Sequence, residues 1–258
     1  MRIATWNVNS IKARSERLLR WLEKHEPDVL CLQELKAEDS GFPLAQVQAA
    51  GYSAVLYGQK TYNGVAILSR EALGPLSNVR AGLGDNVDDP QARLLSAELH
   101  GLTFLCCYVP NGGEPTSEKF AYKLKWLERL VAYLEKHHAA REKLVLCGDL
   151  NIAPADIDVA RPDEWKDTVL CHPLVREAFD TLIAFGLIDS FRALRAEPGL
   201  YSFWDYRMLS FPKGNGLRID HVLVTADVLP RCKRAQIDRD ERKGKLPSDH
   251  APVIIDLD

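Results

Sequence analysis

In the stretch Leu144-Val145-Leu146-Cys147-Gly148-Asp149-Leu150-Asn151, an apolar run leads directly into an acid and an amide two residues apart, and Pro154 follows. Residues i and i+2 of an extended segment point to the same side. Asp149 and Asn151 are therefore expected to face one point from the end of a buried strand, where α/β proteins commonly place their sites. A carboxylate and an amide suit a hard cation or a phosphate oxygen. An Asx-turn that merely caps the strand is the alternative, so this pair alone favours a functional site only slightly.

Strand-like and helix-like segments alternate on both sides of this stretch. Apolar runs predict strands at Arg2–Trp6, Val29–Gln33, Ser53–Tyr57, Gly64–Ser69, Leu94–Leu99, Thr103–Val109, Leu144–Leu150, Ile219–Val224 and Pro252–Leu257. Helical spacing predicts amphipathic helices at Lys12–His25, Thr116–Ala140 and Pro173–Phe185. Several strand-like runs are too close together for helical connections, so we expect an α/β fold with mixed or antiparallel sheets and helices outside. Strand-like runs at both ends, without an obvious linker, predict one domain over residues 1–258.

Composition places the chain among ordinary globular proteins, with 46% hydrophobic and 27% charged residues. No apolar run approaches the length of a membrane span, and the segment from Met1 to Trp6 lacks the pattern of a signal peptide. The six cysteines form no CxxC pair, which favours free buried thiols in a reducing cytoplasm over disulfides or a zinc site. The net charge of −3 does not indicate nucleic-acid binding, but acids at a metal site can mask a basic rim elsewhere.

Polar clusters also follow or precede other strand-like runs. They are Trp6-Asn7-Val8-Asn9, Leu32-Gln33-Glu34-Leu35-Lys36, Tyr108-Val109-Pro110-Asn111-Gly112, Arg218-Ile219-Asp220-His221 and Ser248-Asp249-His250-Ala251-Pro252. Each cluster is weak evidence when taken singly, since Glu34 could be an ordinary exposed acid, His250 a structural histidine and Tyr108 a core residue. Together with the opening stretch they are unlikely to be coincidental, because one rim of strand ends would hold them all.

These residue types suit phosphodiester hydrolysis, which needs charge neutralised on a phosphate oxygen, an oriented water and help for the leaving alkoxide. Glu34, Asp149 and Asp249 offer hard oxygen ligands for Mg²⁺ or Mn²⁺, with Asn7 in support. Zinc is disfavoured because cysteine and histidine ligands are not grouped.

The remaining groups would handle protons and charge. Asp220 and His250 would form an acid–imidazole pair, in which the carboxylate fixes the tautomer and keeps the ring protonated against phosphate. Asn151 and Tyr108 would supply neutral donors to the developing charge.

The motifs, in this order, resemble the exonuclease III family of abasic-site endonucleases, within the DNase I-like endonuclease/exonuclease/phosphatase superfamily. The match runs from Trp6 to Pro252. GDLN and SDH are shared with the wider superfamily, whereas LQELK, YVPNG, SFWDYR and RIDHVL are more specific. The resemblance implies a four-layer αββα sandwich of two mixed sheets flanked by helices. It also implies metal-dependent incision of duplex DNA 5′ to abasic sites, with 3′→5′ exonuclease and 3′-phosphatase or phosphodiesterase activity.

The resemblance also assigns roles to individual residues. Catalysis would use Tyr108, Asp149, Asn151, Asp220 and His250. Metal binding would use Asn7, Glu34, Asp149, Asn151, Asp249 and His250, with Mg²⁺ expected and Mn²⁺ an alternative. Asp149 matches the residue proposed to activate water, Asp220 orients His250, and Asp249 is a metal-linked or outer acid. Neither the number of metal ions nor the identity of the general base follows from the sequence.

Substrate contacts are also implied by the resemblance. Phe203, Trp204, Leu217 and Ile219 resemble a pocket for a flipped abasic sugar, which a normal nucleotide would not fit. Plain core packing is an almost equal alternative for Phe203 and Trp204. Asn9 and Asn111 are further candidates for DNA contact, and Lys60, Arg93, Arg207 and Lys213 are unranked candidates for phosphate contact.

His172 departs from the family pattern, in which a smaller residue often stands near this position. We hypothesise that its imidazole narrows the groove around the damaged nucleotide and favours 3′-end processing over internal incision. A loop histidine without any effect is at least as good an interpretation.

Two other functions are open to a chain with this pattern. Some DNase I-like proteins cleave inositol phosphates or sphingomyelin, but SFWDYR and the absence of a signal sequence argue against those substrates. A binding module with a decayed site would lack at least one of Glu34, Asp149, Asn151, Asp220 or His250, and all are present. We expect a monomer that acts on duplex DNA with abasic sites or blocked 3′ ends, without a membrane partner.

Overall fold

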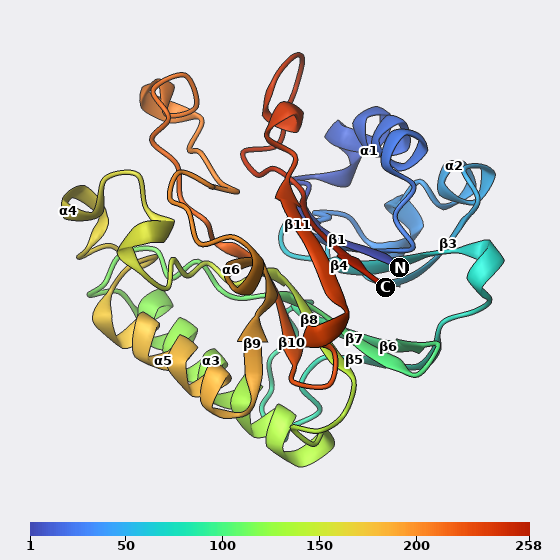
Figure 1. Ribbon diagram of the computed structural model, residues 1–258, viewed down its shortest axis with the longest axis horizontal. Coiled ribbons are helices and arrows are strands. Elements are labelled where there is room, and N and C mark those ends of the chain that lie inside the picture. The colour runs from blue at the N-terminus through green and yellow to red at the C-terminus, as the bar shows by residue number, and fades with distance from the viewer.

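The computed structural model describes residues 1–258, which form two six-stranded mixed sheets with helices on both outer sides (Figure 1). The first sheet has the strand order β11-β12-β1-β2-β4-β3. Its strands are β1 (Arg2–Asn7), β2 (Val29–Gln33), β3 (Tyr52–Tyr57), β4 (Val65–Arg70), β11 (Cys232–Ile237) and β12 (Val253–Leu257). The second sheet has the order β5-β6-β7-β8-β10-β9. Its strands are β5 (Ser77–Ala81), β6 (Leu94–Leu99), β7 (Leu102–Tyr108), β8 (Leu144–Asp149), β9 (Leu187–Asp189) and β10 (Asp220–Thr225).

Six α-helices accompany the sheets, and the four that lie beside them in Figure 1 form the outer layers. The six are α1 (Ile11–His25), α2 (Leu44–Ala49), α3 (Glu118–His137), α4 (Pro162–Trp165), α5 (Pro173–Ala184) and α6 (Ser190–Leu194). In Figure 1, α1 and α2 lie beside the first sheet, and α3 and α5 lie beside the second. None of the helices has the length and apolar content that a bilayer span requires.

Three apolar clusters hold these layers together. One lies between the two sheets and is built from inward-facing residues of both. The other two lie between each sheet and its own helices, as the apolar stripes of α1 and of α3 and α5 require. The expected four-layer arrangement of two mixed sheets and outer helices is confirmed.

Every predicted strand and helix is present, with ends that move by a few residues. The long helix is shorter than predicted and begins after Ser117, whose hydroxyl accepts a hydrogen bond from the Phe120 N–H at 3.3 Å. The strands β5, β9 and β11 escaped prediction, and all three lie at sheet edges. Edge strands are short and polar because one side has no partner strand, so the apolar signal is weak there. The helices α2, α4 and α6 have 6, 4 and 5 residues, too few to show a helical period.

The parallel strand pairs position the polar clusters. Each sheet contains one such pair, β1 with β2 and β7 with β8. The carboxyl ends of a parallel pair lie at the same edge, so Asn7, Glu34, Tyr108 and Asp149 all emerge at one end of the sandwich. β10 runs antiparallel to β8 and pairs Asp220 with Asp149, which brings its first residue to the same place.

Candidate active site

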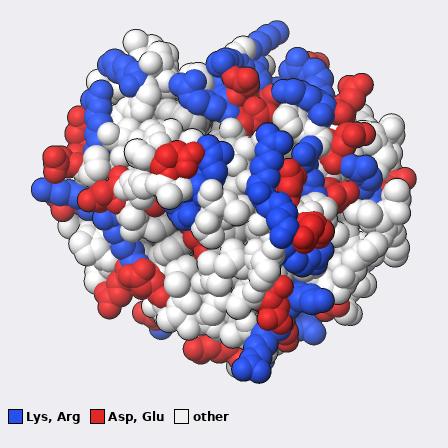
Figure 2. Space-filling model, in the orientation of Figure 1, with Lys and Arg blue, Asp and Glu red and all other residues white.

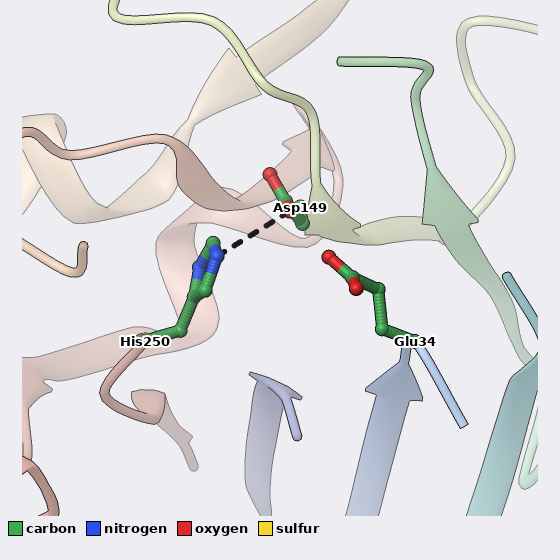
Figure 3. A group of neighbouring side chains, drawn as sticks. All are labelled: Glu34, Asp149 and His250. Atoms are coloured by element: carbon green, nitrogen blue, oxygen red, sulfur yellow. Dashed lines mark ion pairs between the residues drawn. The ribbon is translucent and has the colours of Figure 1, made fainter. Parts of the chain in front are cut away.

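Two carboxylates from different sheets share one amide at this end of the sandwich. The Asn7 Nδ2 donates hydrogen bonds to the Glu34 Oε1 at 2.8 Å and to the Asp149 Oδ2 at 2.9 Å. Glu34 follows β2 with a φ of 52°, a left-handed conformation that reverses the chain and turns its side chain toward Asp149. Figure 3 shows the side chains of Glu34, Asp149 and His250 pointing toward one another. Asn7 thus ties the two sheets together where the acids meet.

The donor set fits a hard divalent cation. One ligand atom each from Glu34, Asp149 and His250 lies within 4.8 Å of the other two. Burial raises the pKa of Glu34, but two neighbours lower it by more. They are the Lys36 ammonium, whose Nζ lies 2.8 Å from the Glu34 Oε2, and the Asn7 amide, so the net pKa is lowered and the carboxyl is ionised. Carboxylate oxygens are the ligands that Mg²⁺ and Mn²⁺ prefer.

Two other predicted metal ligands are engaged with Asn9 instead. The Asn7 Oδ1 accepts a hydrogen bond from the Asn9 N–H at 2.9 Å, and the Asp249 Oδ1 accepts one from the Asn9 Nδ2, also at 2.9 Å. Asp249 is therefore linked to the acid cluster through Asn9 and is not one of the three converging groups. In this arrangement Asn9 supports the site from outside.

His250 lies between two buried carboxylates. Its Nδ1–H donates to the Asp220 Oδ2 at 2.8 Å, and its Nε2 lies 3.7 Å from the Asp149 Oδ2. Burial lowers the pKa of His250, but the carboxylates of Asp220 and Asp149 together raise it well above its ordinary value. Burial raises the pKa of Asp149, against the opposing charge of His250. The ring is thus held as an imidazolium, oriented by Asp220, with its Nε2 toward the acid cluster. Both nitrogens of an imidazolium are donors, so in this state the cation ligands of the group are the carboxylates of Glu34 and Asp149.

Asp149 and Asn151 form an Asx-turn inside this cluster. The Asn151 N–H donates to the Asp149 Oδ1 at 2.9 Å, and Asn151 has a left-handed φ of 52°. The Asn151 Nδ2 donates to the Val109 carbonyl at 2.9 Å, and its Oδ1 accepts from the Asn111 Nδ2 at 3.1 Å. The turn that was the alternative interpretation of the opening stretch is therefore compatible with a site, because it holds the Asp149 carboxylate in place.

Tyr108 completes this end of the second sheet. Its side chain is 9% exposed, and burial, reinforced by Glu34 and Asp149, raises its pKa well above the ordinary value. The phenol is consequently a neutral hydrogen-bond donor at all physiological pH values. The guanidinium of Arg93 lies 4.9 Å from the centre of the Tyr108 ring, and both residues line a hollow of about 510 Å³.

Of the four residues predicted to form a substrate pocket, only Phe203 lines a hollow. Its ring lies 4.9 Å from that of His250, and it faces a hollow of about 370 Å³. Asn111, Trp165, Val169, Leu170 and Arg207 also line this hollow. Trp204, Leu217 and Ile219 are buried in the interior, each at most 1% exposed. This placement agrees with the packing alternative for Trp204.

The candidate phosphate contacts are scattered. Arg93 borders the hollow beside Tyr108, and Arg207 is paired with Asp205 at 2.7 Å on the rim of the second hollow. Lys60 and Lys213 are exposed and line neither hollow. On the side of the molecule seen in Figure 1, Figure 2 shows Lys and Arg side chains interspersed with Asp and Glu, not gathered in one continuous basic surface.

The model of the Endonuclease/Exonuclease/phosphatase family matches residues 4–250. The chain belongs to this family. It is 36% identical to exodeoxyribonuclease III of Haemophilus influenzae, over 98% of both chains. It is 33% identical to the DNA repair nuclease APEX1 of Danio rerio, over 100% of this chain and 82% of that protein.

Solved structures agree with this assignment. An AP endonuclease from Archaeoglobus fulgidus superposes with a TM-score of 0.95 at 39% identity, covering 100% of this chain and 99% of that one. The 3′ phosphatase NExo from Neisseria, bound to a product DNA hairpin, superposes equally well at 40% identity with the same coverage. The resemblance drawn from the sequence motifs is confirmed, and the protein is an enzyme of the DNA repair nuclease class.

His172 does not line the hollow that contains Phe203. It caps the amino end of α5, where its Nδ1 accepts a hydrogen bond from the Leu174 N–H at 3.2 Å. Its ring packs edge-on against Phe120, with 5.0 Å between ring centres. Any effect of His172 on the groove must therefore pass through the Thr168–Cys171 segment or α5.

Two lysines near the site were not singled out from the sequence. Lys36 contacts Glu34, and its Nζ also donates to the Asn9 Oδ1 at 2.5 Å. Lys123 is buried beneath the loops that carry Asn111 and Asn151. A signal for Lys123 exists in the sequence, because it falls on the apolar stripe of α3 between Phe120 and Leu127, where a charged residue is unexpected.

Proposed function

We propose that this nuclease cuts duplex DNA on the 5′ side of abasic sites and removes blocking groups from 3′ ends, using Mg²⁺, with Mn²⁺ as an alternative. The observation that carries the proposal is the convergence of Glu34, Asp149 and His250 at the meeting point of two sheets. The similarity to an AP endonuclease and to a 3′ phosphatase over the whole chain supports both activities.

In this proposal Glu34 and Asp149 would hold the cation, the Asn7 amide would fix both carboxylates, and Asn151 would lie beside them. When bound, the ion neutralises charge on a phosphate oxygen and makes a nearby water more acidic. Asp249 would act indirectly, because its Oδ1 accepts a hydrogen bond from the Asn9 Nδ2 and so holds Asn9 beside the acid cluster.

Asp149 is also placed to take the proton of the attacking water. Burial raises its pKa in the cation-free protein and so brings the carboxylate closer to the acidity that a general base needs near neutral pH, whereas a bound cation would act in the opposite direction. The imidazolium of His250 faces the same point and would donate a hydrogen bond to a phosphate oxygen, where negative charge grows in the transition state. Asp220 keeps that imidazolium charged and aimed.

Neutral donors serve the remaining oxygens. The Tyr108 phenol and the Asn151 amide flank Asp149 and would stabilise charge on the phosphate without repelling it. Asn111, which donates to the Asn151 Oδ1, would fix the orientation of that amide. The Asn151 Nδ2 donates one N–H to the Val109 carbonyl, so its second N–H would be the one that reaches the phosphate.

The hollow beside His250 would receive the deoxyribose. Phe203, Trp165 and Val169 give it apolar walls, and its position next to the imidazole suits a sugar that lacks a base. The alternative is an enzyme that mainly processes 3′ ends and cuts only weakly at internal abasic sites. The similarity to NExo supports this alternative as strongly as the similarity to the AP endonuclease supports internal incision.

We also propose that residues 1–258 act as one domain and as a monomer in the cytoplasm. The pairing of β1 with β12 joins the two ends of the chain, and all six cysteines are buried free thiols, as is common in proteins of a reducing compartment.

A cleavage assay with two DNA substrates tests the proposal. One duplex carries a single internal abasic analogue, and the other a nick with a 3′-phosphate. We expect Mg²⁺-dependent incision of the first and phosphate release from the second, both abolished by EDTA. Equal cleavage in EDTA, or cleavage of neither duplex in Mg²⁺, would overturn the proposal, and the ratio of the two rates decides between the alternatives.

A further inference from the structure

Lys123 is a fully buried cation that the site described above does not use. It lies on the apolar stripe of α3, and its exposed fraction is 0%. It is paired with no carboxylate within 4.0 Å. An ammonium group without a counter-charge is costly to bury, and burial lowers the pKa of Lys123 accordingly, to about 7. A purely packing role at this position would be better served by leucine or methionine.

All three N–H donors of Lys123 are used, and each binds a backbone carbonyl from a different segment. The acceptors are the carbonyls of Asn111 at 3.1 Å, Asn151 at 2.6 Å and Val169 at 2.7 Å. An ammonium offers three donors, so this arrangement is saturated. One side chain thereby joins the segment after β7, the segment after β8 and the segment before α5.

These three segments carry the amide pair and one wall of the substrate hollow. The side chains of Asn111 and Asn151 are hydrogen-bonded to each other at 3.1 Å, and Val169 lines the hollow together with Asn111. Two of the three carbonyl acceptors of Lys123 therefore belong to the residues that form this pair, and the third belongs to the wall of the hollow.

The backbone of these segments adopts conformations that contacts from outside the segments must stabilise. Asn151 has a φ of 52° and Gly112 a φ of 99°, both in the left-handed region that most residues avoid. A Cβ on Gly112 would lie 3.0 Å from the Lys123 Cδ, so the segment packs directly on the lysine stem. The stem and the ammonium together determine where Asn111 and Asn151 lie.

We propose that Lys123 is a positioning residue of the active site, which places the Asn111–Asn151 amide pair for the reaction through their backbone carbonyls. The inference rests on the proposed function, since it gives those amides a task at the phosphate. Displacement of a catalytic group by about 1 Å can cost on the order of 100-fold in rate.

The test is a double-mutant comparison of Lys123→Met in two backgrounds, wild type and Asn151→Ala. Single-turnover cleavage of the abasic duplex and the KM of the steady-state reaction are measured per folded enzyme. Lys125→Met is the matched control, because Lys125 is on the same helix, 71% exposed and bound only to Glu128. It should cleave as the wild type does.

We expect Lys123→Met to lower kcat by about 10- to 100-fold with KM within about threefold in the wild-type background. In the Asn151→Ala background the same change should cost less than about threefold, because the group that Lys123 positions is gone. An unchanged kcat, or the same loss in both backgrounds, would overturn the inference. If Lys123→Met does not fold, Lys123→Gln, which keeps two N–H donors on a shorter stem, enters the same comparison with the same criteria. Wild-type cleavage is read first, so a failure of the proposed function is recognised before any variant is compared.

Discussion

Two buried ionic clusters lie a few residues apart in this protein, and they are built in opposite ways. In the first, Arg218 binds Asp158 and Asp189, each at 2.7 Å, and Arg192 binds Asp158 at 2.6 Å. Two carboxylates thus meet two guanidiniums. Burial raises the pKa of Asp158 and Asp189, but Arg218 more than reverses the effect and leaves both lowered. Charge in this cluster is balanced within the protein.

The second cluster has an excess of acid. Glu34, Asp149 and Asp220 share the cations His250 and Lys36, and the Asp220 Oδ1 has no hydrogen-bond partner. The pKa of Asp149 is raised by burial, in contrast to the lowered values in the balanced cluster. The two clusters therefore differ in role. The acid-rich cluster has negative charge that a bound cation would neutralise, whereas the balanced cluster stabilises the fold and fixes the start of β10, which carries Asp220.

The largest effect is expected for Asp220→Asn in the acid-rich cluster. The amide cannot hold His250 as an imidazolium, so kcat should fall by about 10³- to 10⁴-fold, the range for loss of a carboxylate that orients a catalytic imidazole. The free energy of unfolding should stay equal or rise, because a buried charge without full compensation is removed. Single-turnover cleavage and urea unfolding measure the two quantities, and a large loss of stability would erase the contrast with the balanced cluster.

The second effect is on stability and concerns Arg218→Met in the balanced cluster. The change leaves Asp158 and Asp189 buried without their shared partner, which should cost about 3–5 kcal/mol in the free energy of unfolding. Arg207→Met is the control, because its guanidinium is 85% exposed and pairs with Asp205 at the surface, a contact worth about 0–1 kcal/mol. Equal costs for the two variants in urea unfolding would contradict the account of Arg218.

The third effect is the pH dependence of that cost. A carboxyl whose pKa is lowered by folding contributes stability above its unfolded pKa of about 3.9 and loses it as the pH falls through the folded pKa. Asp158 and Asp189 are such groups. The stability difference between wild type and Arg218→Met should therefore be complete near pH 6 and shrink steadily as the pH falls toward 2. Urea titrations across this range check the sign, and a constant difference would refute it.

The smallest effect is expected at His172, outside both clusters. His172→Gly should raise internal incision relative to 3′-phosphate release by no more than about tenfold, or about 1.4 kcal/mol, because His172 acts on the hollow only through its neighbours. The two rates measured on the two duplexes give the ratio. An unchanged ratio would assign His172 to helix capping alone.

The acid-rich cluster was largely predictable from the sequence, and the balanced cluster was not. Asp149, Glu34 and Asp220 stand at ends of apolar runs, so strand prediction alone places them at one edge of the sandwich. Asp158 lies in a polar loop, and nothing in its spacing reveals that it meets Arg218, which is 60 residues away.

The fold was predictable in its interior and less so at its margins. Central strands such as β8 carry continuous apolar runs, whereas β5 at a sheet edge is exposed throughout and reads as a loop. The substrate hollow was equally hard to predict. Trp165 and Phe203 line it together, but the segments that carry them have no helical or strand periodicity from which their meeting could be inferred. Lys123 is the exception, since its place on an apolar stripe marks it as unusual.

The most direct test of the contrast between the clusters is one paired measurement on Asp149→Asn: its single-turnover rate on the abasic duplex in Mg²⁺ and its melting temperature in EDTA. We expect a rate lowered by at least about 10³-fold and a melting temperature equal to or above that of the wild type. The variant loses a proton acceptor and cation ligand, but also one of three buried acids that His250 and Lys36 neutralise only in part. A rate within tenfold of the wild type, or a rate that falls only as far as the folded fraction does, would contradict it.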